Sequence, residues 1–131
     1  MKIRSKLPLL MLPILSLLAA CSPIVVKGKV IRGGLSMAAT VPASDERLGD
    51  EGIKGVTIEA AQQGRLGEVV TATSRNDGSF SIPLKGNGSL SLPMTVKVTA
   101  DGYLPAEVTL PTPTPEARLL VVLKPMRRSG E

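Results

Sequence analysis

The chain has 131 residues, enough for one compact domain, and only 2% of them are aromatic, so any core must be mainly aliphatic. Histidine is absent and cysteine occurs once, which excludes Ser-His-Asp, Cys-His and His-ligated metal sites as well as an internal disulfide. The formal net charge is +5, but no run of Lys and Arg is interleaved with aromatic residues. Nucleic acid is therefore not an expected partner.

The first 20 residues have the three-part pattern of a secretory signal peptide. Three basic residues among the first six precede an uncharged, Leu-rich stretch over residues 7–18, and Ala19 and Ala20 follow it. As a helix, this stretch would span about 18 Å, well short of the roughly 30 Å hydrocarbon core of a bilayer. We therefore predict a signal peptide rather than a transmembrane span. Its removal leaves 13 basic and 11 acidic residues, a net charge of +2.

The segment Leu18-Ala19-Ala20-Cys21 resembles the bacterial lipobox. Small residues suit the signal peptidase, and only a thiol supplies the nucleophilic sulfur that becomes alkylated by a lipid. The resemblance implies cleavage between Ala20 and Cys21 and an acylated Cys21 that anchors the protein in a membrane. A buried or chance cysteine after an ordinary signal peptide is the alternative. Ser22, rather than Asp, follows the cysteine, which in Gram-negative bacteria is similar to the pattern of outer-membrane lipoproteins.

From Ser22 onward, apolar residues recur at every second position, and no stretch keeps a helical spacing over three turns. This pattern indicates an all-β domain over residues 26–124, which follows a tether of residues 21–25 and precedes a basic tail of residues 125–131. Seven strands are expected, a number typical of a β-sandwich. The predicted strands are Ile24–Ile31, Val56–Ala61, Glu68–Ser74, Ser79–Leu84, Met94–Ala100, Ala106–Leu110 and Leu119–Lys124.

The clearest turn signal is Asn76-Asp77-Gly78, because Asp bonds its own backbone and Gly accepts a positive φ. We expect this turn to join the third and fourth strands into a hairpin, with Phe80 at the centre of the core. Asp77 and Asp101 form the carboxylate pair considered for catalysis. Both adjoin glycines and are explained as turn residues, so the chain is predicted not to be an enzyme.

The segments Lys27–Val30, Gly55–Ile58, Ser74–Ile82 and Val96–Tyr103 together resemble the carboxypeptidase regulatory-like family in their order and spacing. The resemblance implies a transthyretin-like, Ig-like sandwich of seven strands. On physical grounds, Gly102 should turn the chain so that Tyr103 closes one end of the sandwich, with its hydroxyl at the rim.

Arg75 stands where this family often has an acidic residue, so no metal is expected at that turn.

The segment Gly33–Gly52 is long for a connection between the first two predicted strands. We expect a mobile or partly ordered connector, with contact to a ligand as the alternative. Its acidic residues match no EF-hand spacing and flank Arg47, so a specific cation site is not expected. This connector and the Pro111–Pro115 loop are expected to reach farthest sideways or outward. The acidic residues of the connector are Asp45, Glu46, Asp50 and Glu51.

These features together predict a non-catalytic lipoprotein of the cell envelope, located in the outer membrane if the cell is Gram-negative. It would need no cofactor or metal and would act as a structural or protein-interaction module with an unidentified envelope protein as partner. The alternative is a carbohydrate-binding-like surface module, since related sandwiches resemble starch-binding domains. Aromatic poverty counts against that alternative, because sugars stack on aromatic rings and Tyr103 is the one candidate ring.

Overall fold

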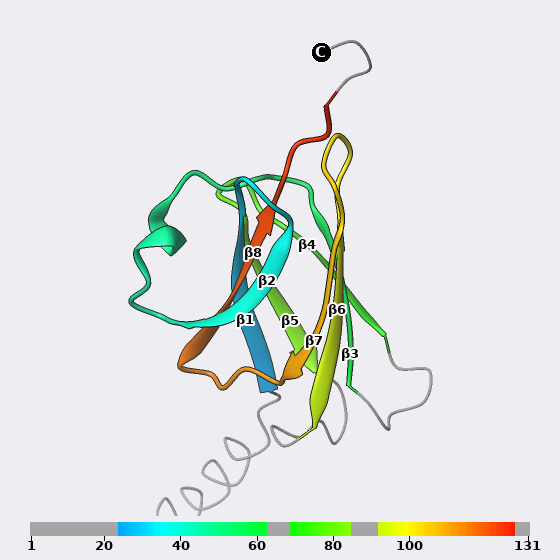
Figure 1. Ribbon diagram of the computed structural model, residues 1–131. Helices are drawn as coiled ribbons and strands as arrows, with labels where there is room; N and C mark the ends of the chain where they lie inside the picture. Colours follow the sequence, from blue (N-terminus) through cyan, green and yellow to red (C-terminus); the bar gives the residue numbers. More distant parts are fainter. Residues whose placement is uncertain (1–23, 63–68, 85–91, 128–131) are drawn as a thin grey trace, which may run out of the picture.

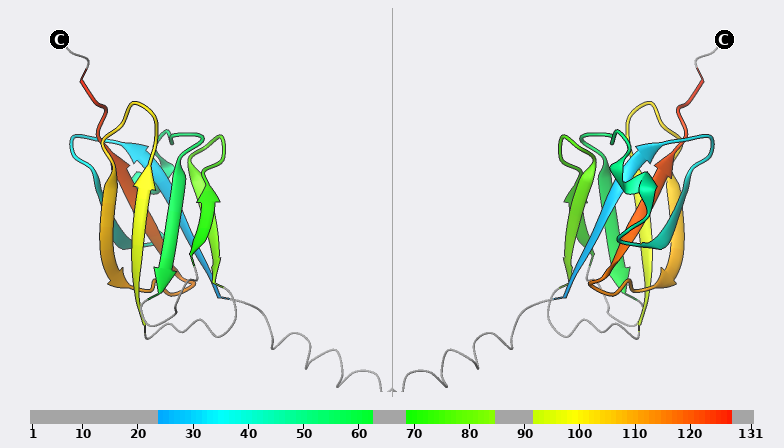
Figure 2. Two further views of the ribbon diagram at one scale, coloured as in Figure 1. Left: turned by 90° about the vertical axis from the view of Figure 1, so that its right-hand side faces the viewer. Right: turned by 90° about the vertical axis from the view of Figure 1, so that its left-hand side faces the viewer.

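Two four-stranded sheets face each other in the computed structural model, which describes residues 24–62, 69–84 and 92–127 (Figures 1 and 2). Sheet I has the strand order β2-β8-β1-β5, and sheet II has the order β4-β3-β6-β7. All neighbours are antiparallel except β1 and β8, which run parallel. The strands are β1 (Ile24–Arg32), β2 (Met37–Pro42), β3 (Thr57–Gln62), β4 (Val70–Thr73), β5 (Ser79–Leu84), β6 (Pro93–Thr99), β7 (Ala106–Pro111) and β8 (Ala117–Leu123).

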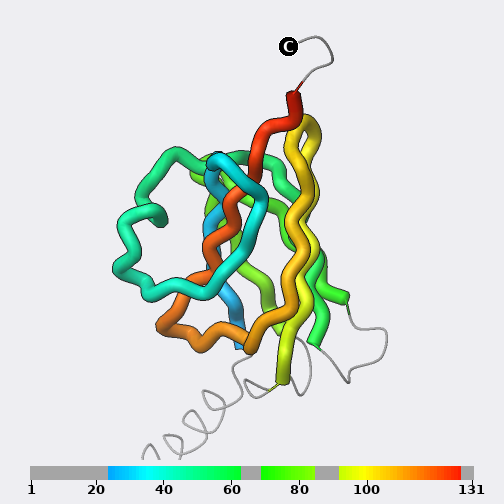
Figure 3. The backbone as a smooth tube through the Cα atoms, in the orientation of Figure 1, coloured from blue at the N-terminus to red at the C-terminus, as the bar shows by residue number. Residues whose placement is uncertain are grey.

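The all-β sandwich agrees with the sequence, but the expected number of seven strands is wrong, because the described residues form eight. The additional strand, β2, lies within Gly33–Gly52, together with a short 3₁₀ helix, η2 (Glu46–Gly49). β2 pairs along its whole length with β8 and forms an edge of sheet I. The expectation of an unstructured connector is therefore corrected: this segment adds a strand and then bulges outward beside sheet I (Figure 3).

The main core lies between the sheets and is aliphatic around a single aromatic ring. Phe80 is 1% exposed and stands opposite Gly28 in the register of β1 and β5. A Cβ atom at Gly28 would collide with the Phe80 ring and with the carbonyl oxygen of Leu119. Glycine at this position thus lets the large ring lie directly on β1.

A second, smaller cluster covers the outer face of sheet I. Ile31, Val41, Leu120 and Val122 are buried there, and Leu48 of η2 packs against them. β8 is consequently buried on both faces, which is why its sequence is apolar at consecutive positions rather than at alternate ones.

The turn at Asn76-Asp77-Gly78 forms, with Gly78 at a φ of 85°. The Arg75 amide donates to the Ser79 carbonyl at 2.8 Å, and the Gly78 amide donates to the Arg75 carbonyl at 2.9 Å. The expected hairpin is nevertheless wrong, because β4 and β5 diverge from this turn into different sheets. Their inward side chains face one another across the core instead of lying side by side on one sheet.

Within the described residues, no helix has both the length and the apolar character needed to cross a membrane.

Candidate functional site

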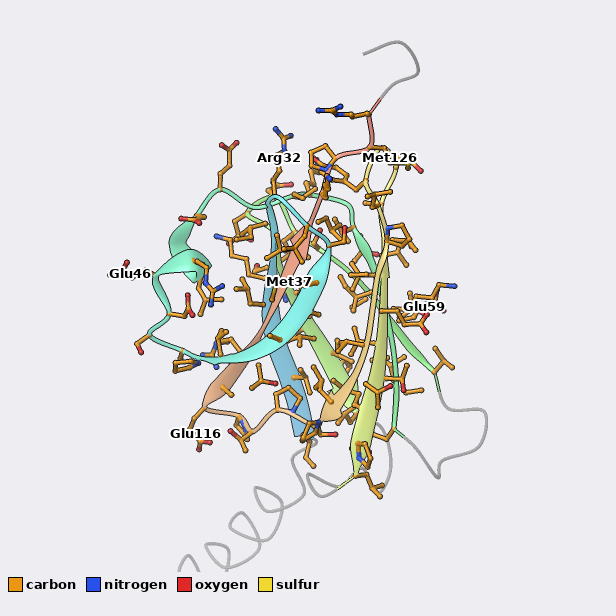
Figure 4. The ribbon with its side chains drawn as sticks, viewed as in Figure 1. Arg32, Met37, Glu46, Glu59, Glu116 and Met126 are labelled. Carbon is orange, nitrogen blue, oxygen red and sulfur yellow. The ribbon has the colours of Figure 1, made fainter. Side chains whose placement is uncertain are left out.

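The end of the sandwich opposite Ile24 gathers most of the residues singled out by sequence. β1 starts at Ile24 and reaches this end at Arg32, and Figure 4 shows Arg32 and Met126 here and Glu116 at the other end. The turn with Asp77 and Gly78 and the turn with Gly102 and Tyr103 lie at the same end, which we call the distal end. Ala20 and Cys21 fall outside the described residues.

Two glycines allow chain segments to cross closely at the distal end. Gly52 makes a bridge with Ile31 and lies against the turn, so a Cβ atom on it would collide with the Asp77 carbonyl. A Cβ atom on Gly78 would come within 2.6 Å of the Gly52 Cα. The crossing is fixed by hydrogen bonds of 2.9 Å from the Val30 amide to the Gly78 carbonyl and from the Ile53 amide to the Val30 carbonyl.

A buried serine fastens the chain just after this crossing. The Ser74 hydroxyl donates to the Ile53 carbonyl at 2.6 Å and accepts from the Val56 amide at 2.9 Å. Ser74 is 4% exposed, and its hydroxyl supplies a partner to the buried Val56 amide and to the partly buried Ile53 carbonyl. The position of the Ile53–Val56 segment is thereby set.

The C-terminal segment closes the other side of the distal end. Gly102 has a φ of 83°, and Tyr103 makes an isolated bridge with Pro125. The Leu104 amide donates to the Lys124 carbonyl and the Met126 amide to the Gly102 carbonyl, both at 2.8 Å. These bonds hold Tyr103 half-buried, with its ring packed against the main core.

Arg32 binds the exposed side of Tyr103. Its Nη2 donates to the tyrosine Oη at 3.1 Å, and its Cζ lies 5.9 Å from the ring centroid, within cation–π range. The bond with Tyr103 raises the pKa of Arg32 above its ordinary value, so the guanidinium stays charged. The phenol hydroxyl is thus at the rim of the sandwich and is engaged by a cation.

A hollow of about 330 Å³ lies beside this pair. It presents one carboxylate, two cations and one phenol, which can offer charge and hydrogen bonds to a polar or anionic ligand. The hollow is lined by Arg32, Glu51, Gly52, Ile53, Lys54 and Tyr103. Tyr103 and Glu51 are among the candidate residues that the sequence indicates, whereas Arg32 and Lys54 are not, because their convergence depends on pairing between distant segments.

Two further carboxylates, Asp77 and Asp45, are engaged locally. Asp77 accepts hydrogen bonds from the hydroxyl and amide of Ser79 at 2.6 and 3.0 Å, and these bonds lower the pKa of Asp77. Asp45 caps η2 and pairs with Arg47 at 2.8 Å, which lowers the pKa of Asp45 to about 2. Within residues 24–62, 69–84 and 92–127, no group of three or more potential metal ligands is found.

Arg75, on the distal turn, donates to the hydroxyls of Ser79 and Ser81 at 3.1 and 3.2 Å. It therefore fastens the turn to the outer face of β5.

The Pro111–Pro115 loop does not reach outward as expected, because the parallel register of β1 and β8 places it at the tether end. Gly28 pairs with Leu119, so the segment just before β8 lies level with Ile24 at the tether end. This loop therefore lies near the point where the tether joins the domain, rather than far from it.

No protein-family model, characterised protein or solved structure matches this chain.

Proposed function

We propose that this chain is a lipid-anchored, non-catalytic β-sandwich lipoprotein of the cell envelope that serves as a structural or protein-interaction module. The lipobox at Leu18–Cys21 motivates the anchor, and Ser22 favours the outer membrane in a Gram-negative cell. The likeness to carboxypeptidase regulatory-like, transthyretin-like domains belongs to the same proposal, and eight strands rather than seven are a departure from it.

One observation carries the interaction role: Ile24 and the Arg32–Tyr103 pair lie at opposite ends of the sandwich. β1 connects them over nine residues, which places the distal end roughly 26 Å from the tether at about 3.3 Å per residue. With Cys21 in the bilayer, only Ser22 and Pro23 separate the anchor from β1. The distal end is then the part of the domain that is free to meet a partner beyond the membrane surface.

The anchor is tested by Cys21→Ser, with Ser22→Ala as the matched control. In a bacterial host fed radioactive palmitate, we expect wild type and Ser22→Ala to be labelled and processed, because both keep the sulfur that carries the lipid. Cys21→Ser should retain its signal peptide and remain unlabelled. Labelling of Cys21→Ser at the wild-type level would refute the anchor.

Ligand binding at the distal hollow is the second candidate, and the exposed edge of Tyr103 beside Arg32 and Lys54 favours it. Because Arg32 already lies over the ring, the hollow suits an acidic sugar or another anion better than a neutral sugar that needs a free aromatic face. Isothermal titration with matched acidic and neutral oligosaccharides separates this role from a purely structural one.

A further inference from the structure

The four edge strands of the sandwich differ in how they are protected from pairing with another chain. β2, β5 and β7 each contain a proline, at Pro42, Pro83 and Pro111. Proline and charged side chains are the usual means by which edge strands avoid adding a further strand. β4, with the sequence VTAT, contains neither, and the preceding Val69 is also uncharged.

The backbone of β4 has unpaired groups on its outer edge. Ser74 directs both its amide and its carbonyl toward the β3 side, at 2.9 Å from the Val56 carbonyl and 3.1 Å from the Gly55 amide. The direction of the backbone amide and carbonyl groups alternates from residue to residue along a strand. The groups of Val70 and Ala72 therefore also face β3, and the groups of the residues between and beside them face away from it. These outward residues are Val69, Thr71 and Thr73. The side chains of these three outward residues are all exposed, Val69 by 57%.

We propose that β4 pairs with β4 of a second copy of this chain, antiparallel and centred on Thr71. This register places Thr71 opposite its own copy and Val69 opposite Thr73, so every outward backbone group meets another in about six hydrogen bonds. The two sheets II become one continuous sheet of eight strands.

The side chains suit a symmetric partner. A two-fold axis at Thr71 would set any charge near it against its like, but residues 69–73 carry none. The cross-strand Thr71 pair repeats an arrangement already present in sheet II, where Thr95 and Thr109 hydroxyls lie 3.0 Å apart. In this register β4 is paired with an identical sequence, so the same residues serve on both sides of the pair.

The symmetry is compatible with the proposed lipid anchor, on which this step rests, in one orientation. An axis relating two antiparallel edge strands is perpendicular to the sheet and reverses the direction of every strand, so both copies present sheet I on the same side while their Ile24 ends lie at opposite ends of the pair. Both tethers therefore enter one bilayer when the pair lies with sheet I toward it, whereas an unpaired copy stands on its tether end. β4 has only four residues, so the pairing is weak in dilute solution, and confinement to a membrane raises the effective concentration that drives it.

Cross-linking of the anchored protein tests the pairing. Residues directly opposite in a hydrogen-bonded pair have Cα atoms about 5.5 Å apart, within the range that a disulfide spans. Thr71→Cys should therefore shift to twice the monomer mass in oxidised bacterial membranes. Thr109→Cys, at another exposed threonine on the opposite edge of sheet II, and wild type should stay monomeric.

Thr71→Pro is the complementary variant, which should abolish the pairing between copies. The Thr71 amide points away from β3, so proline there keeps the β3 pairing while removing a donor needed by a second copy. We expect an unchanged circular dichroism spectrum and loss of the dimer that an amine cross-linker captures from wild type in vesicles. The pairing is overturned if Thr71→Cys stays monomeric or shifts to a mass other than twice its own. It is also overturned if Thr71→Pro gives as much cross-linked dimer as wild type.

Palmitate labelling of the same Thr71→Cys samples separates the two proposals. Labelled but monomeric protein overturns the pairing and leaves the anchor standing. Unlabelled protein overturns the anchor, and because Cys21 is then a free thiol, a Thr71→Cys dimer supports the pairing in that case when it also forms in a Cys21→Ser background.

Discussion

Phe80 shows how much of the stability of an aromatic-poor core depends on one side chain. It is the single phenylalanine of the chain, 1% exposed, and it lies on the bare backbone of Gly28. The neighbours of the ring are aliphatic side chains on fixed strands, which collapse only partly into a void. Phe80→Ala should lower the free energy of unfolding by roughly 3–5 kcal/mol.

Chemical denaturation measures this change, with Leu35→Ala as the control. Leu35 is 58% exposed, so its truncation should alter stability by no more than about 0.5 kcal/mol. A loss below about 1 kcal/mol for Phe80→Ala would show that the ring is not enclosed by the core.

At the scale of elements, η2 acts as a cover for sheet I. Leu48 packs on the outer cluster formed by Ile31, Val41, Leu120 and Val122. Truncating Leu48 to Ala removes part of this cover and should cost roughly 1–2 kcal/mol of unfolding free energy. Arg47→Ala breaks only the exposed pair with Asp45 and should cost less than about 1 kcal/mol. Equal denaturation midpoints for the two variants would mean that η2 does not shield the sheet.

The same segment marks the limit of what alternation alone can predict. The seven predicted strands correspond to strands of the structure, with Glu68 of the third outside the described residues, because each has at least one buried face and Gly, Asn or Pro near its ends. β2 was missed because its sequence, MAATVP, contains small residues and only one buried side chain, Val41. The signal that could have revealed it is in β8, where five consecutive buried residues require cover on both faces.

The distal end shows a similar division between local and non-local information. The turns at Gly78 and Gly102 are encoded locally by a glycine at a positive φ. The hairpin was predicted wrongly because the turn fixes only the first hydrogen bonds, while the sheet that each strand joins depends on β1 and β3. Arg32 and Lys54 come together with Tyr103 through pairing at Gly52 and Pro125, which no short-range pattern encodes.

For the whole molecule, the short tether has a directional consequence. At about 3.3–3.6 Å per extended residue, the segment from Cys21 to Ile24 reaches roughly 10 Å, and Pro23 stiffens it. Glu116 is exposed and precedes β8 at the tether end, whereas Lys54 lies at the distal end. In an unpaired anchored copy, Glu116 should therefore lie beside the lipid headgroups, and Lys54 should not.

A photo-crosslinking side chain placed at position 116 or 54 measures this arrangement directly. We expect lipid adducts from position 116 and few from position 54, because position 116 precedes β8 at the tether end whereas position 54 lines the hollow beside Arg32 at the distal end. A flexible spacer of about 20 residues after Pro23 adds a root-mean-square reach of roughly 25 Å and should reduce the adducts at 116 to the level at 54. Equal lipid labelling of both positions at the native tether length would show that the domain does not stand on its tether end. A yield at 116 that the spacer leaves unchanged would show that the domain binds lipid by itself rather than being held there by its anchor.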